Sequence, residues 1–201
     1  MSDSDKNSRH AARMARKKAV VDASINAAQN ERGLVLIHTG NGKGKSTAAF
    51  GLLARALGHG MKAAVVQFIK NRSDTGEEAF FRSNPNVSWH VMGDGFTWET
   101  QDAARDLATA RKAWELVCGY LQDENIDVVI LDEFTYTLKY GWLTLEEVSA
   151  ALKARPAMQH VVITGRAAPD GLIALADTVS EINLVKHAFH EGVQAMPGIE
   201  W

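Results

Sequence analysis

Short apolar runs alternate with segments of mixed polarity along most of this chain. The runs lie at residues 34–38, 63–69, 87–92, 127–133, 160–166 and 178–185. Runs of this length are typical of buried strands, and the Ala- and Leu-rich segments between them are typical of helices. Parallel strands need crossover connections, which are usually helices. The pattern therefore predicts an α/β fold with a mostly parallel sheet of about six strands, covered by helices on both faces.

Local signals place some of the helix ends. Thr144 and Glu147 form a capping box, which predicts a helix that ends before Pro156. Thr100 is expected to cap a long helix that begins near Gln101. The polar segment 70–78, KNRSDTGEE, is expected to be a loop.

Residues 1–30 form a basic N-terminal segment that differs from the rest, so we expect a second unit to span 31–201. Four apolar residues recur at helical spacing in this segment, and Gly33 marks an expected helix end. The stripe consists of Met14, Val21, Ile25 and Ala28; the basic residues are Lys6, Arg9, Arg13, Arg16, Lys17 and Lys18. Two interpretations remain open. The segment is either a solvated tail with a docking helix, or a mobile lid that closes over an anionic ligand.

The loops that follow the predicted strands should meet in space. In parallel α/β sheets, ligands bind at the carboxyl ends of the strands. We therefore expect one edge of the sheet to gather the loops after Thr39, Gln67, Met92, Leu131 and Thr164.

The most distinctive of these loops is TGNGKGKSTAAFG, residues 39–51. Backbone N–H groups at a helix N-terminus can surround a phosphate, and glycines let the backbone approach it closely. Lys45 would place its charge on the outer phosphates, and the Ser46 hydroxyl can ligate magnesium. Thr39 stands where the standard motif has glycine. A simple helix-capping turn would not need both Lys43 and Lys45, so we predict a phosphate-binding loop followed by a helix to about residue 57.

A second motif, VVILDE, ends a buried strand in Asp132 and Glu133. One of these acids is expected to coordinate magnesium, directly or through water. The alternative is that the pair only caps the next helix. Together the two motifs indicate nucleotide binding but do not specify a reaction.

Composition narrows the class of protein. The chain has 201 residues, is 46% hydrophobic and carries a formal net charge of -2, which argues against nucleic acid as its main partner. The single cysteine, Cys118, cannot form an internal disulfide and is expected in the core. No segment approaches the roughly 20 apolar residues of a membrane-spanning helix. A cytoplasmic protein is expected.

Several blocks resemble the ATP:corrinoid adenosyltransferase family, the type with the modified phosphate loop. They are TGNGKGKSTAAFGLLARALGHGMKAAVVQFIK, GFTWET, LDEFTY, ITGR and ADTVSE. Their order and spacing match from about residue 30 to 190, and the basic N-terminal helix is also similar. The resemblance implies a three-layer P-loop NTPase (RecA-like) fold with an N-terminal helical extension, and it makes Thr39 an expected residue.

The resemblance also implies a reaction. In that family ATP and magnesium bind in reversed orientation along the loop. Cobalt(I) of a reduced corrinoid attacks the 5′-carbon of the ribose, which yields an adenosyl-corrinoid and inorganic triphosphate. Lys45 would neutralise the leaving group, and Ser46 with Glu133 would ligate magnesium. The triphosphate would be held by Gly40, Asn41, Gly42, Lys43, Gly44, Lys45, Ser46 and Thr47.

Cobalt(I) has no proton to lose, so no general base is required. Catalysis then depends on in-line positioning and on stabilising charge that develops on the triphosphate. By resemblance, Phe96 and Trp98 of GFTWET contact the lower face of the corrin and exclude water and the lower axial ligand. From the residues alone, ordinary core packing is the alternative for this pair.

Other residues are candidates of lower rank. Arg55 and Arg166 are expected to contact nucleotide or corrinoid, and Gln67 and Lys70 are weaker candidates for the same site. The histidines show no metal-binding pattern. We expect the closely spaced pair in KHAFHEG, His187 and His190, to be surface residues in a loop.

The resemblance further implies a homodimer, an N-terminal lid and a reduced flavoprotein as electron donor. Two alternatives are a P-loop kinase or ATPase, and a corrinoid-binding protein without turnover. The sequence leaves open whether the acceptor is complete cobalamin, cobinamide or an early precursor.

Overall fold

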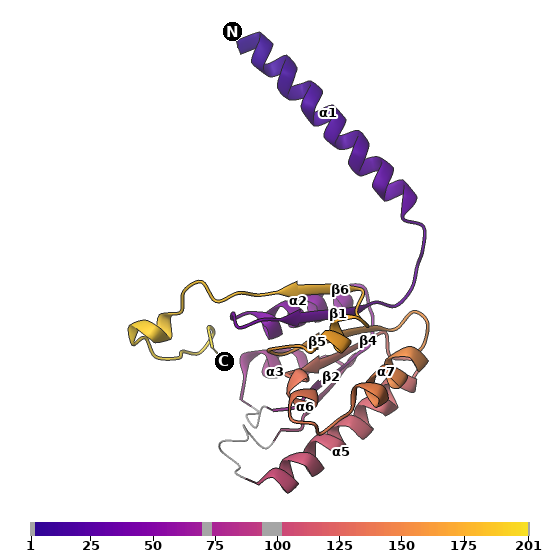
Figure 1. The fold of residues 1–201 in the computed structure, drawn as a ribbon, viewed down its shortest axis with the longest axis vertical. Helices are drawn as coiled ribbons and strands as arrows, with labels where there is room; N and C mark the ends of the chain where they lie inside the picture. The colour runs from indigo at the N-terminus through magenta and orange to yellow at the C-terminus, as the bar shows by residue number, and fades with distance from the viewer. Residues whose placement is uncertain (1–2, 70–73, 94–101, 201) are drawn as a thin grey trace. The chain divides into compact units, whose positions relative to one another are not determined.

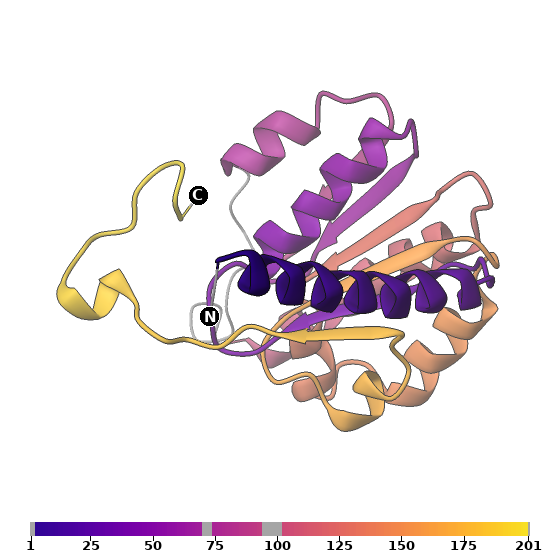
Figure 2. The ribbon, with the colours of Figure 1, turned by 90° about the horizontal axis from the view of Figure 1, so that it is seen from above.

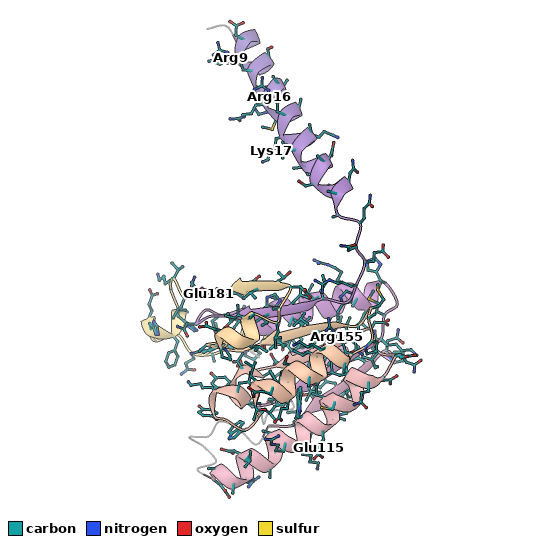
Figure 3. All side chains as sticks on the ribbon, turned by 45° about the vertical axis from the view of Figure 1, so that its right-hand side comes forward. Arg9, Arg16, Lys17, Glu115, Arg155 and Glu181 are labelled. Atoms are coloured by element: carbon teal, nitrogen blue, oxygen red, sulfur yellow. The ribbon has the colours of Figure 1, made fainter. Side chains whose placement is uncertain are left out.

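The computed structural model describes residues 3–69, 74–93 and 102–200, and it divides the chain into two units, Met1–Arg32 and Gly33–Trp201. The first unit consists mainly of α1, Asp3–Ala27. Its side chains are almost all exposed, including the labelled Arg9, Arg16 and Lys17 (Figure 3). The helix ends six residues before Gly33, earlier than expected. The two interpretations of this segment stay predictions.

The second unit alternates strands and helices, as the apolar pattern predicts. Each of the six predicted strands is present, with ends shifted by a few residues at most. The elements are β1 (Val35–Thr39), α2 (Lys45–Gly58), β2 (Ala63–Gln67), α3 (Gly76–Phe81), β3 (Val87–Val91), α5 (Ala103–Gln122), β4 (Val128–Asp132), α6 (Thr135–Lys139), α7 (Leu145–Ala154), β5 (His160–Thr164), α8 (Asp170–Ile173), β6 (Thr178–Glu181) and the short 3-10 helix η1 (Ala188–Glu191).

These strands form one sheet in the order β3-β2-β4-β5-β1-β6, and every described pairing is parallel (Figure 1). The predicted six-stranded parallel sheet is therefore confirmed. Strand β5 lies between β1, which leads into the glycine-rich loop, and β4, which ends in the acidic pair. Because all strands run in one direction, the loops that follow them share one edge of the sheet.

Alternate residues of the central strands pack against different helices, which creates three layers (Figures 1 and 2). On β4, Val129 and Leu131 join a cluster with Trp114 of α5 and Val148 of α7. Their neighbours Val128 and Ile130 join another cluster, which contains Ala49 and Leu53 of α2 together with Phe81 and Trp89. Both faces of the central strands are thus covered, and the core explains the continuous apolar runs.

Close packing fixes the point where the second unit begins. The guanidinium group of Arg155, at the end of α7 (Figure 3), donates hydrogen bonds to the carbonyl oxygens of Gln159 and Gly33. Gly33 also donates its N–H to the Ala157 oxygen at 2.7 Å. A Cβ at position 33 would lie within 3.0 Å of the Gln159 backbone, so glycine is needed for this close approach. Gly33 therefore marks the point where the chain enters β1, and it does not mark the end of a helix.

Two local predictions are wrong. Helix α5 is capped by Asp102, whose carboxylate accepts a hydrogen bond from the Arg105 N–H at 3.0 Å, whereas Thr100 lies outside the described residues. Part of the expected polar loop is helical, because Thr75 caps α3 through the Glu78 N–H. The predicted cap of α7 by Thr144 is confirmed.

The structure also describes the environment of the single cysteine and the character of the helices. Cys118 is half-buried and packs against the larger core cluster. Within the described ranges, none of the helices has both the length and the apolar character needed to cross a bilayer.

Candidate functional site

A polar cavity of about 370 Å³ lies at the carboxyl edge of the sheet. The start of α2 and its preceding loop form one wall, through residues 42–47. Glu133 follows β4 and Arg166 follows β5, and both line the same cavity. The structure thus brings together three of the loops that the sequence predicts to converge.

The glycine-rich loop ends in a sharp turn at Gly44, whose φ of 105° lies in the left-handed region that favours glycine. Helix α2 begins at Lys45, and its first backbone hydrogen bond runs from the Ala48 N–H to the Gly44 oxygen at 2.8 Å. The amides of the first turn have no partner within a helix and point beyond its N-terminus. They are therefore suited to bind an anion in the cavity.

Lys45 is nearly buried, with 6% of its surface exposed, and its Nζ donates a hydrogen bond to the Gly42 oxygen at 2.6 Å. Burial lowers the pKa of Lys45, the charge of Glu133 raises it, and the nearby charges of Arg166 and Lys43 lower it. Three cationic side chains and a carboxylate therefore act on one another electrostatically. A polyanion would relieve the repulsion among the cations.

Gly40 and Gly42 pack closely against a segment that is distant in the sequence. A Cβ on either residue would lie within 3.0 Å of the Ile182 backbone, in the segment that follows β6. The Gly42 N–H donates to the Ile182 oxygen at 2.7 Å, so this amide is already used within the protein. These two glycines are needed for chain packing, and their contact with phosphate stays a prediction.

The adjacent acids Asp132 and Glu133 differ in environment. Asp132 is fully buried, and its two carboxylate oxygens accept hydrogen bonds from Gln67 Nε2 at 2.9 Å and from Thr164 Oγ1 at 2.7 Å. Glu133 has a φ of 57°, and its N–H donates to Thr164 Oγ1 at 2.9 Å. The backbone turn directs Glu133 to the cavity, whereas Asp132 holds the strand ends together.

The structure places the two candidate arginines at opposite ends of the sheet. Arg55 lies in the last turn of α2, ten residues after Lys45, so about 15 Å of helix separates their backbones. Arg55 lines a separate apolar cavity of about 260 Å³ with Leu34, which directly precedes β1, and Val128, the first residue of β4. Arg55 therefore lies at the end of α2 remote from the phosphate loop, and its assignment to the ATP site stays a prediction.

The remaining candidates have mixed outcomes. Gln67 is buried and donates a hydrogen bond to Asp132. Phe96, Trp98 and Lys70 lie outside the described residues. Asn41 and Thr47 are exposed and Ser46 is half-buried in the loop and first turn.

The two histidines of KHAFHEG belong to a 3-10 turn and not to an irregular loop, because His187 caps η1 and His190 lies within it. His187 is half-buried and accepts a hydrogen bond from the Phe189 N–H at 3.1 Å, and His190 is exposed.

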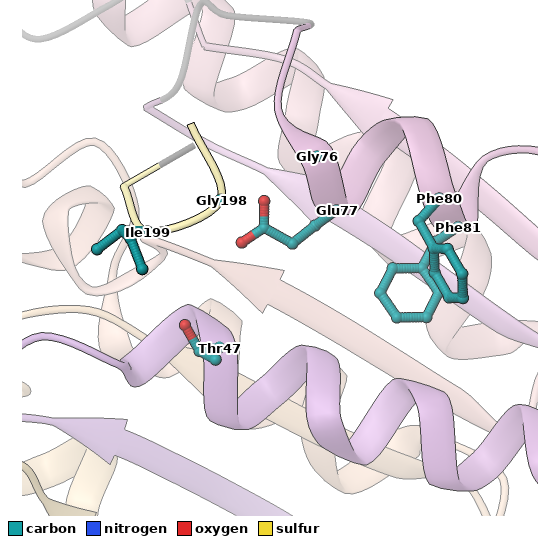
Figure 4. A pocket seen from close by; sticks show the side chains of 7 residues that line it. All are labelled: Thr47, Gly76, Glu77, Phe80, Phe81, Gly198 and Ile199. Atoms are coloured by element: carbon teal, nitrogen blue, oxygen red, sulfur yellow. The ribbon is translucent and has the colours of Figure 1, made fainter. Parts of the chain in front are cut away.

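The sequence reasoning missed two walls of the site. Glu77 of α3 lines the polar cavity, and the carboxylate of Glu200 forms an ion pair with Lys43. A neighbouring cavity of about 360 Å³ lies between Thr47, Glu77 and Ile199 (Figure 4). The Thr75–Glu78 capping box was the available signal for α3, but no pattern indicated that the C-terminal segment returns to the loop.

The comparisons with known proteins agree with this geometry. Residues 31–201 match a family described as ATP:corrinoid adenosyltransferase BtuR/CobO/CobP, and residues 1–25 match a family described as Cob(I)alamin adenosyltransferase N terminal. The chain belongs to the ATP:corrinoid adenosyltransferase family. A corrinoid adenosyltransferase of Pseudomonas aeruginosa is 59% identical and matches across 98% of each chain. Two others, from Escherichia coli and Salmonella typhimurium, are each 48% identical across 96% of this chain and 98% of their own.

Proposed function

We propose that this adenosyltransferase moves the 5′-deoxyadenosyl group of ATP to cobalt(I) of a reduced corrinoid and releases triphosphate. The observation that carries the proposal is the cavity in which the start of α2, Lys45, Glu133 and Arg166 meet, in a chain of this family. The cobalt–carbon bond forms as the bond between the 5′-carbon and its oxygen breaks. The electron pair of the broken bond leaves with the triphosphate.

The protein's contribution is to stabilise that leaving group. The amides of the first turn of α2 and the charge of Lys45 face one cavity, where burial strengthens electrostatic interactions. Arg166 adds a second cation from the loop after β5, the strand beside β1. Groups fixed in place before the reaction stabilise developing charge without reorganising.

The site also suits magnesium. Ser46 and Glu133 bring a hydroxyl and a carboxylate to the cavity, and magnesium prefers oxygen ligands. No group of three or more His, Cys, Asp or Glu side chains that could hold a metal occurs among the residues described here. We infer that phosphate oxygens and water complete the coordination, as is usual for nucleotide-bound magnesium. Magnesium would neutralise part of the charge on the triphosphate, and Asp132 would support Glu133 without binding the metal.

The remaining assignments are proposals that extend the family resemblance. Phe96 and Trp98 would contact the lower face of the corrin, and α1 would act as a lid over the bound substrates. We also propose a homodimer, a reduced flavoprotein as electron donor and a cytoplasmic location.

The decisive experiment is product analysis. The protein is incubated with ATP, magnesium and chemically reduced cobalamin, cobinamide or an a,c-diamide precursor. We expect the absorption spectrum of an adenosyl-corrinoid and one triphosphate per cobalt–carbon bond. ADP and phosphate would instead indicate a kinase or ATPase, and tight binding without turnover would indicate a binding protein. Relative rates among the three acceptors would identify the preferred corrinoid.

A further inference from the structure

Thr39 occupies the position at which a standard phosphate loop has glycine, and its side chain is buried at the end of β1. Its backbone φ is not positive, so the conformation does not require glycine. Its Oγ1 accepts a hydrogen bond from the N–H of Ala168 at 3.1 Å. Ala168 belongs to the loop after β5, which carries Arg166 to the cavity.

This loop has an unusual backbone. Gly165 has a φ of 147° and Ala167 a φ of 50°, so Arg166 lies between two residues with positive φ. A non-glycine residue in the left-handed region costs about 1 kcal/mol or more, and it persists where the surroundings fix it. Contacts on either side of Ala167 are therefore expected to determine where Arg166 points.

Three hydrogen bonds supply those contacts. The Gly165 N–H donates to the His38 oxygen at 3.2 Å, and Thr135 Oγ1 donates to the Arg166 oxygen at 2.8 Å. The third is the bond from the Ala168 N–H to Thr39, and it lies beyond the strained residue. Thr39 thus closes the loop on the side that the other two bonds leave open.

We propose that Thr39 is a positioning residue whose hydroxyl holds the loop after β5 and thereby orients Arg166 toward the triphosphate. The inference deepens the proposed function, on which it rests for the identity of the anion. Glycine at position 39 would supply no acceptor for Ala168. The departure from the standard motif therefore connects the phosphate loop to a cation on another strand.

A double-mutant cycle tests this connection. Wild type, Thr39→Val, Arg166→Ala and the double variant are compared by kcat, KM for ATP and equilibrium Kd for magnesium-ATP. Thr39→Val removes a hydrogen bond and should lower kcat/KM about tenfold. Arg166→Ala removes a charged contact and should lower kcat/KM about thirtyfold. In the Arg166→Ala background, adding Thr39→Val should lower kcat/KM by less than about twofold.

Rescue and control variants complete the test. Thr39→Ser keeps the hydroxyl, so its kcat/KM should stay within about twofold of wild type. Thr39→Gly should lower kcat/KM as much as Thr39→Val does. Thr39→Gly also serves if the valine variant does not fold. Thr144→Val removes another hydroxyl that accepts a backbone N–H, at the start of α7, and should lower the melting temperature without changing KM or kcat.

The outcomes are distinguishable. Additive losses in the cycle, wild-type values for Thr39→Val, or failure of serine to rescue would overturn the inference. If wild type binds magnesium-ATP but forms no adenosyl-corrinoid, the proposed function fails, and coupling in Kd still decides the role of Thr39. A wild-type protein that binds no magnesium-ATP would overturn both.

Discussion

Helix α2 has a cavity at each end, and the two cavities differ in chemistry. The N-terminal cavity, of about 370 Å³, has Lys45, Glu133 and Arg166 on its walls. The C-terminal cavity, of about 260 Å³, is lined mainly by apolar residues such as Leu34 and Val128, and Arg55 also lines it. A helix presents N–H groups at its start and C=O groups at its end. A cation at the start therefore helps to bind an anion, whereas one at the end complements the helix dipole.

The largest expected effect comes from the N-terminal end. Lys45→Ala should lower the rate of adenosyl transfer by about a thousandfold or more, because it removes the buried positive charge that stabilises the departing triphosphate. The fold should persist, since burial lowers the pKa of Lys45 and its charge is held in place at some cost. The rate of adenosyl-corrinoid formation and the melting temperature measure the two effects.

Lys43→Ala is the matched control for this prediction. Lys43 is about half exposed, so its charge is screened by solvent, and we expect a loss of at most about tenfold. Retained turnover in Lys45→Ala, or equal losses in the two variants, would contradict the role of the buried lysine.

The next effect concerns the acid that faces the cavity. Glu133→Gln keeps the shape of the side chain but removes a negatively charged ligand, so turnover should fall by about a hundredfold at ordinary magnesium concentrations. Raising magnesium should recover part of the loss. A magnesium titration of the rate measures the shift in half-saturation, and an unchanged titration curve would exclude Glu133 as a ligand.

Asp132→Asn should have a smaller effect on the rate and a clear effect on stability. Asp132 accepts hydrogen bonds from both Gln67 and Thr164, and an amide can accept on only one side. One donor is then left without its acceptor, which should lower the free energy of unfolding by about 1–3 kcal/mol. We expect turnover to fall about tenfold without a shift in the magnesium titration.

Denaturant unfolding of Asp132→Asn and Glu133→Gln, side by side, checks the separation between a supporting acid and a ligand. A magnesium shift in Asp132→Asn as large as that in Glu133→Gln would mean that both acids bind the metal.

The sequence predicted the elements better than it predicted the contacts between them. Continuous apolar runs located the strands, because both faces of a parallel sheet are buried. The pair Asp132 and Glu133 was found, but their different roles depend on the turn at Glu133, which no pattern marks. The packing of Ile182 against Gly42 joins segments that are distant in the chain, and local signals carry no information about it.

Arg55 shows the same limit, and it provides the smallest expected effect. Its place on the helix after the phosphate loop suggested a ligand, yet it lies at the C-terminal end of α2. Arg55→Ala should change kcat and KM for ATP by less than about twofold, because about 15 Å of helix separates Arg55 from the start of α2. It should also reduce stability slightly, by about 0.3–1 kcal/mol, since a cation near the helix C-terminus is lost. Arg166→Ala is the matched comparison, and equal kinetic losses in the two variants would mean that the two ends of α2 are not functionally distinct.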